Sequence, residues 1–145
     1  MNFYNLDGAA RLVDLPGYGY AQVPKAVRAA WDRLVGAYFA ARPSLVGVVL
    51  LMDARHPMTP QDERLLGWLR PFGLPQLAVL TKADKLSRAE ATSALRSARE
   101  QLKGDCKEAL LFSSTSGVGV AEARELLWKW LAAIDAAAGN KRPPA

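Results

Sequence analysis

Short apolar runs alternate with longer segments of helical periodicity along most of this chain. Three of the runs, at residues 45–52, 76–81 and 109–113, are too short for typical helices, and each ends in polar residues. The segments between and after them repeat apolar residues every three or four positions, which predicts amphipathic helices. Strands that alternate with helices form mostly parallel sheets with helices on both faces. The pattern therefore predicts an α/β fold whose ligands bind at the carboxyl ends of the strands.

The first part of the chain has a different pattern. Asn2–Leu6 and Ala10–Leu15 are predicted to form an antiparallel hairpin, with Asp7-Gly8 as its turn. A loop over residues 16–23 follows, and a helix is predicted to begin near Pro24 and to end before Pro43. The positions that share one face of this helix are Val27, Trp31, Leu34, Val35 and Tyr38.

Two later helices carry start signals. Thr59 followed by Pro60 suits an N-cap and a first helical position, and Ser87 with Glu90 has the spacing of a capping box. The last helix is predicted after the turn at residues 117–119. We expect residues 1–138 to form a single domain and the basic, proline-rich tail at 139–145 to be disordered.

Polar loops follow three of the predicted strands. Asp14-Leu15-Pro16-Gly17 comes after the hairpin, and Thr81-Lys82-Ala83-Asp84 and Phe112-Ser113-Ser114 end the last two apolar runs. Each motif alone is weak, since a capped turn, a helix entry or a serine-rich turn has the same composition. Their order along the chain is that of three signature loops of small GTPases, which supports a nucleotide site.

The longer strings Asp-Leu-Pro-Gly-Tyr-Gly-Tyr-Ala, Thr-Lys-Ala-Asp-Lys and Phe-Ser-Ser closely resemble the EngB family of bacterial ribosome-assembly GTPases. The resemblance runs from about Asn2 to the last helix. It implies the three-layer fold of P-loop GTPases, GTP or GDP as ligand with Mg²⁺, and slow hydrolysis. It also implies a cytoplasmic role in assembling the large ribosomal subunit, through that subunit or its RNA, and in normal cell division and septation.

Guanine recognition can be argued from the residues themselves. An ionised Asp84 has two acceptor oxygens, which match the adjacent N1–H and amino donors of guanine and not the edge of adenine. Lys82 can lay its alkyl stem over the purine, and the Thr81 hydroxyl can join neighbouring loops. The resemblance implies that Ala83 belongs to the same loop. It also implies that the loop at Phe112, Ser113 and Ser114 donates backbone hydrogen bonds to the guanine oxygen.

The resemblance assigns the phosphate side to residues 14–17. Asp14 would contact Mg²⁺ through a water and Gly17 would donate its amide to the terminal phosphate, with Leu15 and Pro16 between them. Tyr18 stands where Ras-like enzymes carry the glutamine that orients water, which implies slow hydrolysis or another way of placing that water. Tyr18, Tyr20 and Trp31 are candidates for a nucleotide-dependent surface, although the helical spacing of Trp31 favours a core position.

Part of the family pattern is absent from these 145 residues. The sequence contains no Gly-x-x-x-x-Gly-Lys-Ser/Thr loop and no first-switch threonine. In EngB-like proteins both precede the strand that matches Asn2–Leu6, together with a first strand that lies in the centre of the sheet. We therefore expect a G domain that lacks its central strand. The two buried edges beside the gap would carry unpaired backbone groups. Either those two strands close on each other, or another chain fills the gap, or the chain is a truncated piece that folds poorly.

The composition of the chain restricts the possible partners and locations but does not indicate a function. The net charge of +5 permits an RNA partner without demanding one, we expect no DNA, and we predict neither secretion nor membrane insertion. One cysteine, Cys106, excludes an internal disulfide. Asp53, Arg55 and His56 look like a family element, but the sequence gives them no role. A nucleotide-independent scaffold for RNA or protein, and an inactive fragment, remain alternatives to GTP binding.

Overall fold

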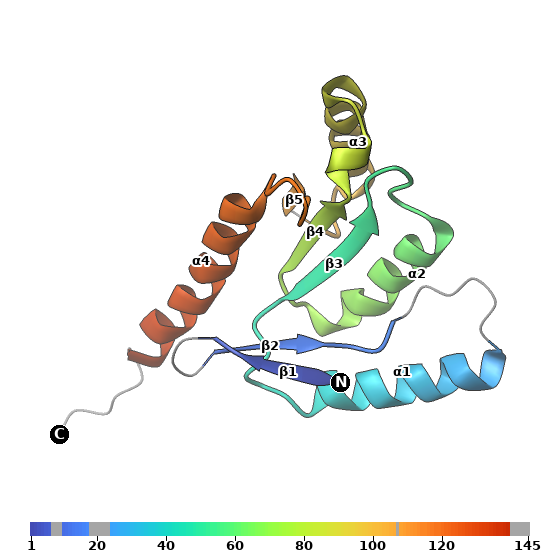
Figure 1. Ribbon diagram of the computed structural model, residues 1–145. Helices are drawn as coiled ribbons and strands as arrows, with labels where there is room; N and C mark the ends of the chain where they lie inside the picture. The colour runs from blue at the N-terminus through green and yellow to red at the C-terminus, as the bar shows by residue number, and fades with distance from the viewer. Residues whose placement is uncertain (7–9, 18–23, 107, 140–145) are drawn as a thin grey trace. The chain divides into compact units, whose positions relative to one another are not determined.

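The computed structural model describes residues 1–6, 10–17, 24–106 and 108–139. Its backbone contacts divide the chain into two compact units, Met1–Leu45 and Val46–Ala145. A hairpin and one helix make up the first unit, and a three-stranded sheet with its helices makes up the second (Figure 1). The Asp7-Gly8 turn, Tyr18, Tyr20 and the tail beyond residue 139 lie outside the described residues.

The first unit contains the predicted hairpin. Strand β1 (Asn2–Asn5) pairs antiparallel with β2 (Arg11–Asp14), and its register places Asn2 opposite Asp14. Helix α1 (Lys25–Ala40) follows, with Pro24 at its N-cap. The helix and the hairpin are both where the sequence predicted them.

The inner face of α1 was predicted only in part. Val35 and Phe39 are its buried residues, whereas Val27 and Leu34 are 54% and 53% exposed. At about 100° per residue, Val27 and Leu34 lie roughly 80° and 100° around the helix from Val35. They therefore flank the buried stripe, and the prediction that they belong to it is wrong.

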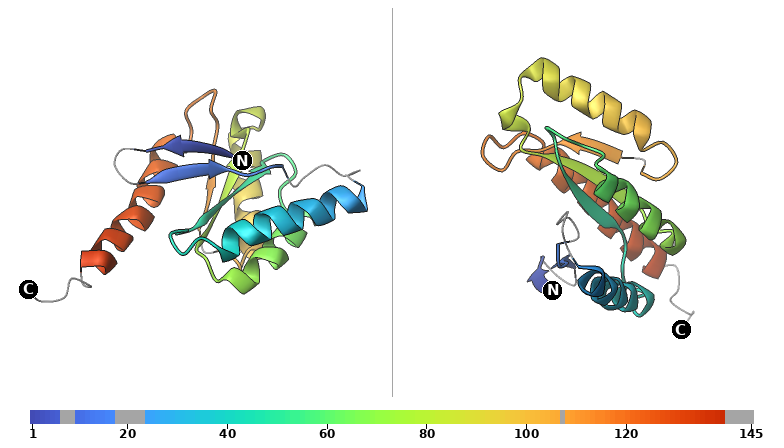
Figure 2. Two further views of the ribbon diagram at one scale, coloured as in Figure 1. Left: turned by 90° about the horizontal axis from the view of Figure 1, so that it is seen from below. Right: turned by 90° about the vertical axis from the view of Figure 1, so that its right-hand side faces the viewer.

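The second unit is a parallel α/β sheet, as the alternating pattern predicted. Strands β3 (Val48–Asp53), β4 (Gln76–Thr81) and β5 (Glu108–Leu111) lie in the order β3-β4-β5, with both pairs parallel. Helices α2 (Pro60–Leu69), α3 (Arg88–Gln101) and α4 (Val120–Gly139) follow the three strands in turn (Figure 2). Short 3₁₀ helices at Arg70–Phe72 and Ala83–Lys85 were not predicted.

Local capping signals were reliable guides to helix starts. The Thr59 hydroxyl accepts from the Asp62 amide while the Asp62 carboxylate accepts from the Thr59 amide, which completes a capping box. Ser87 and Glu90 exchange the same pair of bonds at the start of α3. Each box satisfies backbone donors that the first helical turn leaves unpaired.

The core of the second unit lies on both faces of its sheet. On one face Leu77, Val79 and Leu110 pack against apolar residues of α4. On the other, the alternate strand residues Leu50, Met52, Ala78 and Leu80 are buried, as are the inner residues of α2 and α3. Right-handed crossovers between neighbouring parallel strands place α2 and α3 on one face, so the unit has three layers (Figure 1).

Strand β3 is paired along one edge only among the residues that the structure describes. Among the described residues β3 pairs only with β4, and β2 pairs only with β1. Leu51 of β3 is 69% exposed and lies on the opposite face of the sheet from its buried neighbours Leu50 and Met52. The expectation of a sheet without its central strand therefore agrees with the pairing of the described strands.

Cys106 is buried just before β5, and its sulfur lies 3.0 Å from the carbonyl oxygens of Gln76 and Glu108. This burial raises the pKa of the thiol.

No helix in the described ranges is long and apolar enough to cross a membrane.

Candidate functional site

Backbone and side-chain hydrogen bonds join the loops at the carboxyl ends of all three parallel strands. The Thr81 hydroxyl donates to the Met52 carbonyl at 3.0 Å, and the Ala54 amide donates to the Thr81 carbonyl at 2.8 Å. On the other side, the Ala83 amide donates to the Phe112 carbonyl at 3.0 Å. The hydroxyl of Thr81 thus joins neighbouring strand ends, and the loops after β4 and β5 form one connected surface.

Lys82 marks the point where β4 turns into the next loop. Its backbone is left-handed, with φ 59° and ψ 32°, a conformation that is uncommon for residues other than glycine. The chain then enters the 3₁₀ helix Ala83–Lys85, in which Ala83 is buried. This turn brings Asp84 toward the loop after β5.

Asp84 and Ser113 meet at the centre of this surface. The Ser113 hydroxyl donates to Oδ1 of Asp84 at 2.7 Å, and Ser113 itself is 1% exposed. The same hydroxyl oxygen accepts from the amides of Thr115 and Ser116, at 3.2 and 3.1 Å. Ser113 therefore fixes one oxygen of the Asp84 carboxylate and also shapes its own loop.

The carboxylate of Asp84 is held in its charged form. The hydrogen bond from Ser113 lowers the pKa of Asp84, and the positive charge of Lys85, with its Nζ 3.8 Å from Oδ2, acts in the same direction. An oriented, ionised carboxylate is an acceptor for a ligand that presents two adjacent N–H donors.

Most amides of the loop after β5 are used within it. The Ser113 amide donates to the Val118 carbonyl, and the Gly117 amide donates to the Ser113 carbonyl, each at 2.9 Å. Ser114 is exposed, and its amide has no acceptor within the described part of the chain. The Ser114 amide, next to Ser113 in the chain, is therefore a donor that this loop can offer to a ligand.

Gly119 lets this loop close. Its φ of 75° is left-handed, and a Cβ built there would lie 1.8 Å from the carbonyl oxygen of Leu111, whereas one built on Gly117 would contact nothing within 4 Å. The backbone at Gly119 therefore passes against the end of β5, which brings the loop back over Ser113.

Asp53 and Arg55, which the sequence left without a role, lie beside Lys82. Oδ1 of Asp53 accepts from Nε and the amide of Arg55, both at 3.0 Å, and Oδ2 accepts from Nη2 of Arg55 at 2.7 Å. Oδ2 also accepts from Nζ of Lys82 at 3.1 Å. The Arg55 side chain, followed by its amide and by Lys82, holds the pKa of Asp53 well below its usual range.

Sequence reasoning missed these side-chain contacts because they depend on strand register. Asp53 pairs with Thr81 at the ends of β3 and β4, so Lys82 is the next residue beyond the pair. The signal available in the sequence was that both segments follow apolar runs, but runs alone do not fix the register. His56 donates its amide to the Asp53 carbonyl at 3.0 Å, which completes the turn.

The residues predicted for the phosphate side belong to the other unit. Asp14 ends β2, is exposed, and accepts a hydrogen bond from the Asn2 amide group at 3.2 Å. The Trp31 indole donates to the Pro16 carbonyl at 2.6 Å, and Trp31 is partly buried. Leu15 is partly buried and Gly17 is exposed. These four residues belong to the unit Met1–Leu45, and the loops of the parallel sheet belong to the unit Val46–Ala145.

Asp14 could supply a single carboxylate to a bound metal ion. Within the described residues no group of three or more His, Cys, Asp or Glu side chains could cage an ion. Mg²⁺ commonly uses one or two carboxylates with several waters and substrate phosphates, so a single carboxylate such as Asp14 is compatible with that mode of binding.

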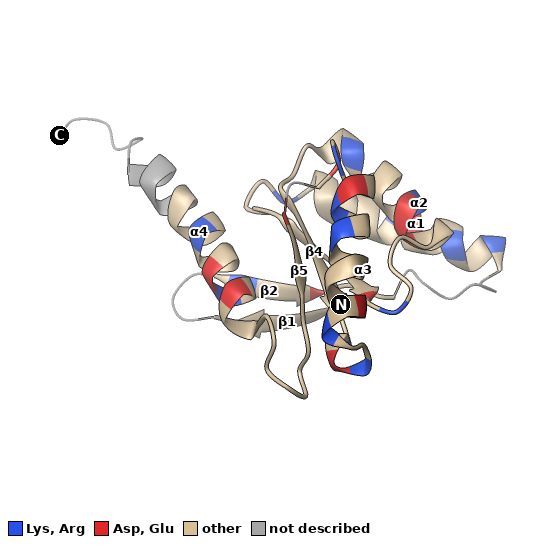
Figure 3. Ribbon diagram, turned by 90° about the horizontal axis from the view of Figure 1, so that it is seen from above, with Lys and Arg blue, Asp and Glu red and all other residues tan. Residues whose placement is uncertain are grey.

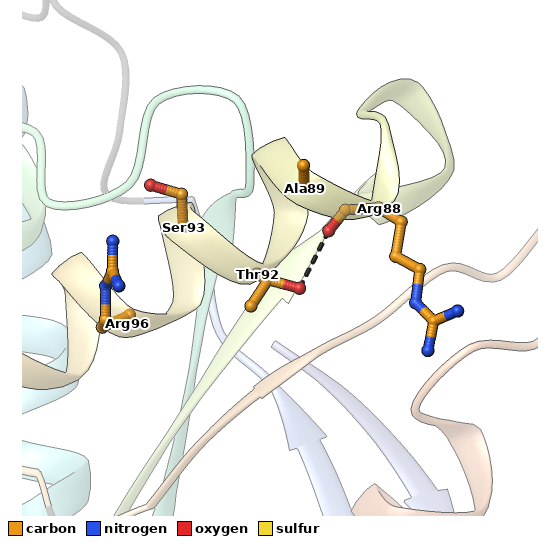
Figure 4. A pocket seen from close by; sticks show the side chains of 5 residues that line it. All are labelled: Arg88, Ala89, Thr92, Ser93 and Arg96. Carbon is orange, nitrogen blue, oxygen red and sulfur yellow. Dashed lines mark hydrogen bonds between the residues drawn. The ribbon is translucent and has the colours of Figure 1, made fainter.

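A depression on α3 does not compete with this site. Figure 4 shows the side chains that line it, and all come from that one helix. The Thr92 hydroxyl donates to the Arg88 carbonyl at 2.8 Å, and the Arg88 and Arg96 guanidinium groups point in different directions (Figure 4). These groups do not converge on one ligand.

Comparison with known proteins identifies the family. A protein from Azoarcus sp. named "Probable GTP-binding protein EngB" is 44% identical over 146 residues, which cover 99% of this chain and 69% of that protein. The chain belongs to the EngB family. An EngB protein from Methylobacillus flagellatus is 48% identical over 134 residues, covering 90% of this chain and 64% of that one. The chain thus spans about two thirds of the length of these curated relatives.

Structural comparison shows the fold. A crystal structure described as a probable GTP-binding protein engB matches with a TM-score of 0.71 and 16% identity, covering 89% of this chain and 78% of that one. The fold is therefore the three-layer α/β fold of P-loop GTPases, as predicted. None of the models of protein families that were compared matches the chain.

Proposed function

We propose that this EngB-family chain binds guanine nucleotides through the loops that follow β4 and β5. The observation that carries the proposal is the 2.7 Å hydrogen bond from Ser113 to Asp84, which fixes an ionised carboxylate beside the exposed Ser114 amide. Together they offer two acceptors and one donor in adjacent positions. Guanine has the matching N1–H and amino donors next to its carbonyl oxygen, whereas adenine presents a different edge.

The remaining residues of this surface have supporting roles in the proposal. The Lys82 stem covers one face of the purine, and Thr81 and Ala83 fix the loop through their bonds to neighbouring strand ends. Phe112 contributes its backbone, which connects the two loops. The curated relatives are named as GTP-binding proteins, which supports a guanine nucleotide as the ligand.

For the whole protein we propose binding of GTP and GDP with Mg²⁺, followed by slow hydrolysis. In the whole protein Asp14 would hold Mg²⁺ through a water and the Gly17 amide would meet the terminal phosphate, with Leu15 and Pro16 shaping the loop between them. Mg²⁺ would neutralise phosphate charge there. These 145 residues contain no Gly-x-x-x-x-Gly-Lys-Ser/Thr sequence, so guanine recognition is the part of the proposal that this chain itself can test.

The cellular role proposed is assembly of the large ribosomal subunit in the cytoplasm, with a consequence for cell division. The net charge of +5 supports an RNA surface as partner. On α3, basic and acidic residues are interspersed, so that helix does not form a patch of one sign (Figure 3). Co-sedimentation of the whole protein with large subunits, with GTP and with GDP, tests this role; binding equal to that of a basic control protein would refute it.

Guanine binding is tested by titrating the chain with fluorescent GDP and GTP, using ADP as control. We expect selective binding of the guanine nucleotides, and we expect Asp84→Asn to shift preference toward xanthine nucleotides, whose carbonyl accepts from the new amide. Asp105→Asn is a matched control, because it removes a carboxylate that pairs with Arg70 before β5, near the opposite ends of the strands. Equal binding of ADP and GDP would refute the proposal.

A further inference from the structure

Asp53 is the one carboxylate of the described site that contacts the proposed purine-covering lysine. Its Oδ2 lies 3.1 Å from Nζ of Lys82 and 2.7 Å from Nη2 of Arg55. The side chains of Lys82 and Arg55 are 57% and 43% exposed, whereas that of Asp53 is 27% exposed. Asp53 is thus the least exposed of the three side chains and lies between two long cationic ones.

Arg55 fixes the orientation of the Asp53 carboxylate. Two side-chain nitrogens of Arg55 donate to the two carboxylate oxygens, and the Arg55 amide donates a third bond to Oδ1. Fork-like pairing of this kind defines orientation as well as distance. The remaining acceptor capacity of Oδ2 is directed to Lys82.

Lys82 is therefore held at both ends. Its backbone is fixed in the left-handed region between β4 and the 3₁₀ helix, while its ammonium is held from β3 by Asp53. The alkyl stem between these points is therefore more restricted than that of a lysine held only by its backbone. An exposed lysine without such an anchor loses considerable rotamer freedom when it covers a ligand.

We propose that Asp53, oriented by Arg55, is a positioning residue that sets the Lys82 stem in place for the guanine plane. This inference rests on the guanine-binding proposal and deepens it, because it assigns a role to a segment outside the three signature loops. Asp53 acts through Lys82 and does not itself contact the base.

The test is a set of GMP and AMP titrations of the ¹⁵N-labelled chain, followed by NMR. GMP is the probe because it reports the base loops with little help from phosphate contacts. We expect Asp53→Asn and Lys82→Met each to weaken GMP binding about two- to fivefold, the range of an exposed ion pair. The double variant should bind GMP as weakly as Lys82→Met alone, because both changes break the same link.

Two further variants separate positioning from general stability. Arg55→Gln should weaken GMP binding less than Asp53→Asn, since the carboxylate remains but loses its orientation. Asp105→Asn removes a similar carboxylate–arginine pair elsewhere in the unit and should leave GMP binding unchanged. The amide spectrum of each variant shows whether the fold is intact, and Arg55→Gln provides a second reading if Asp53→Asn does not fold.

The outcomes distinguish the two proposals. A wild-type chain that does not prefer GMP to AMP overturns guanine binding, and this inference with it. A wild-type chain that prefers GMP, with Asp53→Asn equal to wild type or additive with Lys82→Met, overturns the positioning role alone.

Discussion

Replacing Gly119 by alanine tests how the loop after β5 is closed. Gly117 and Gly119 of this loop both have left-handed backbone, with φ of 82° and 75°. An alanine in that conformation costs about 1–2 kcal/mol. Gly117→Ala, at φ 82° with nothing within 4 Å of the new methyl, should destabilise the chain by that amount alone. The pair therefore separates backbone strain from steric conflict.

The conflict at Gly119 is with backbone. The added Cβ would lie 1.8 Å from the Leu111 carbonyl oxygen, while ordinary contact begins at 3.4 Å, so one segment must move by about 1.6 Å. Such a shift strains two hydrogen bonds, from Ser113 to the Val118 carbonyl and from Ala123 to the Gly119 carbonyl, both 2.9 Å. At about 1 kcal/mol each, the total loss for Gly119→Ala is about 3–4 kcal/mol.

Urea unfolding followed by tryptophan fluorescence measures both variants, since the chain contains four tryptophans. We expect Gly119→Ala to lower the free energy of unfolding by clearly more than Gly117→Ala, with an unchanged dependence on urea concentration. If the two values agreed within about 0.5 kcal/mol, the close approach to β5 would not be a constraint in solution, and the reasoning would be wrong.

Three other expectations follow from the site. Ser113→Ala should raise the pKa of Asp84 toward its ordinary value, seen in a carboxyl ¹³C NMR titration, because the main hydrogen bond that lowers it is removed; an unchanged pKa would refute that cause. Thr81→Val should lower the free energy of unfolding by about 1 kcal/mol through loss of the bond to Met52, while Thr81→Ser should largely keep it. The lowered pKa of Asp53 adds stability that is complete above its unfolded pKa near 4 and is lost as the pH falls through the folded value. Asp53→Asn should therefore show a shallower loss of stability below about pH 4 than wild type, and equal slopes in acid unfolding would contradict this.

The elements that local chemistry specifies were predictable from sequence. Capping residues such as Ser87 mark a helix start wherever they lie, because their bonds reach only three residues along the chain. The alternation of strands and helices predicted the parallel sheet, because a helix between two strands is the usual connection between parallel neighbours. The misplacement of Val27 and Leu34 shows the limit, since helical spacing defines a stripe but not how wide a stripe becomes buried.

The site was predictable as a set of loops but not as a set of contacts. Motif order led to Asp84 and Ser113, yet the hydroxyl bond between them spans 29 positions and depends on how β4 and β5 align. The same holds for Asp53 and Lys82, which the register of β3 and β4 brings together. Such pairings are non-local, and a one-residue slip would separate them.

Because Cys106 is buried, the reactivity of its thiol reports local opening of the structure around it. A maleimide can reach this lone thiol only when the segment before β5 separates from β4, so the labelling rate measures how often that end of the sheet opens. Because the thiol lies far along the strands from Asp84, nucleotide that slowed labelling would show that the whole sheet, and not only the loops, becomes more stable on binding.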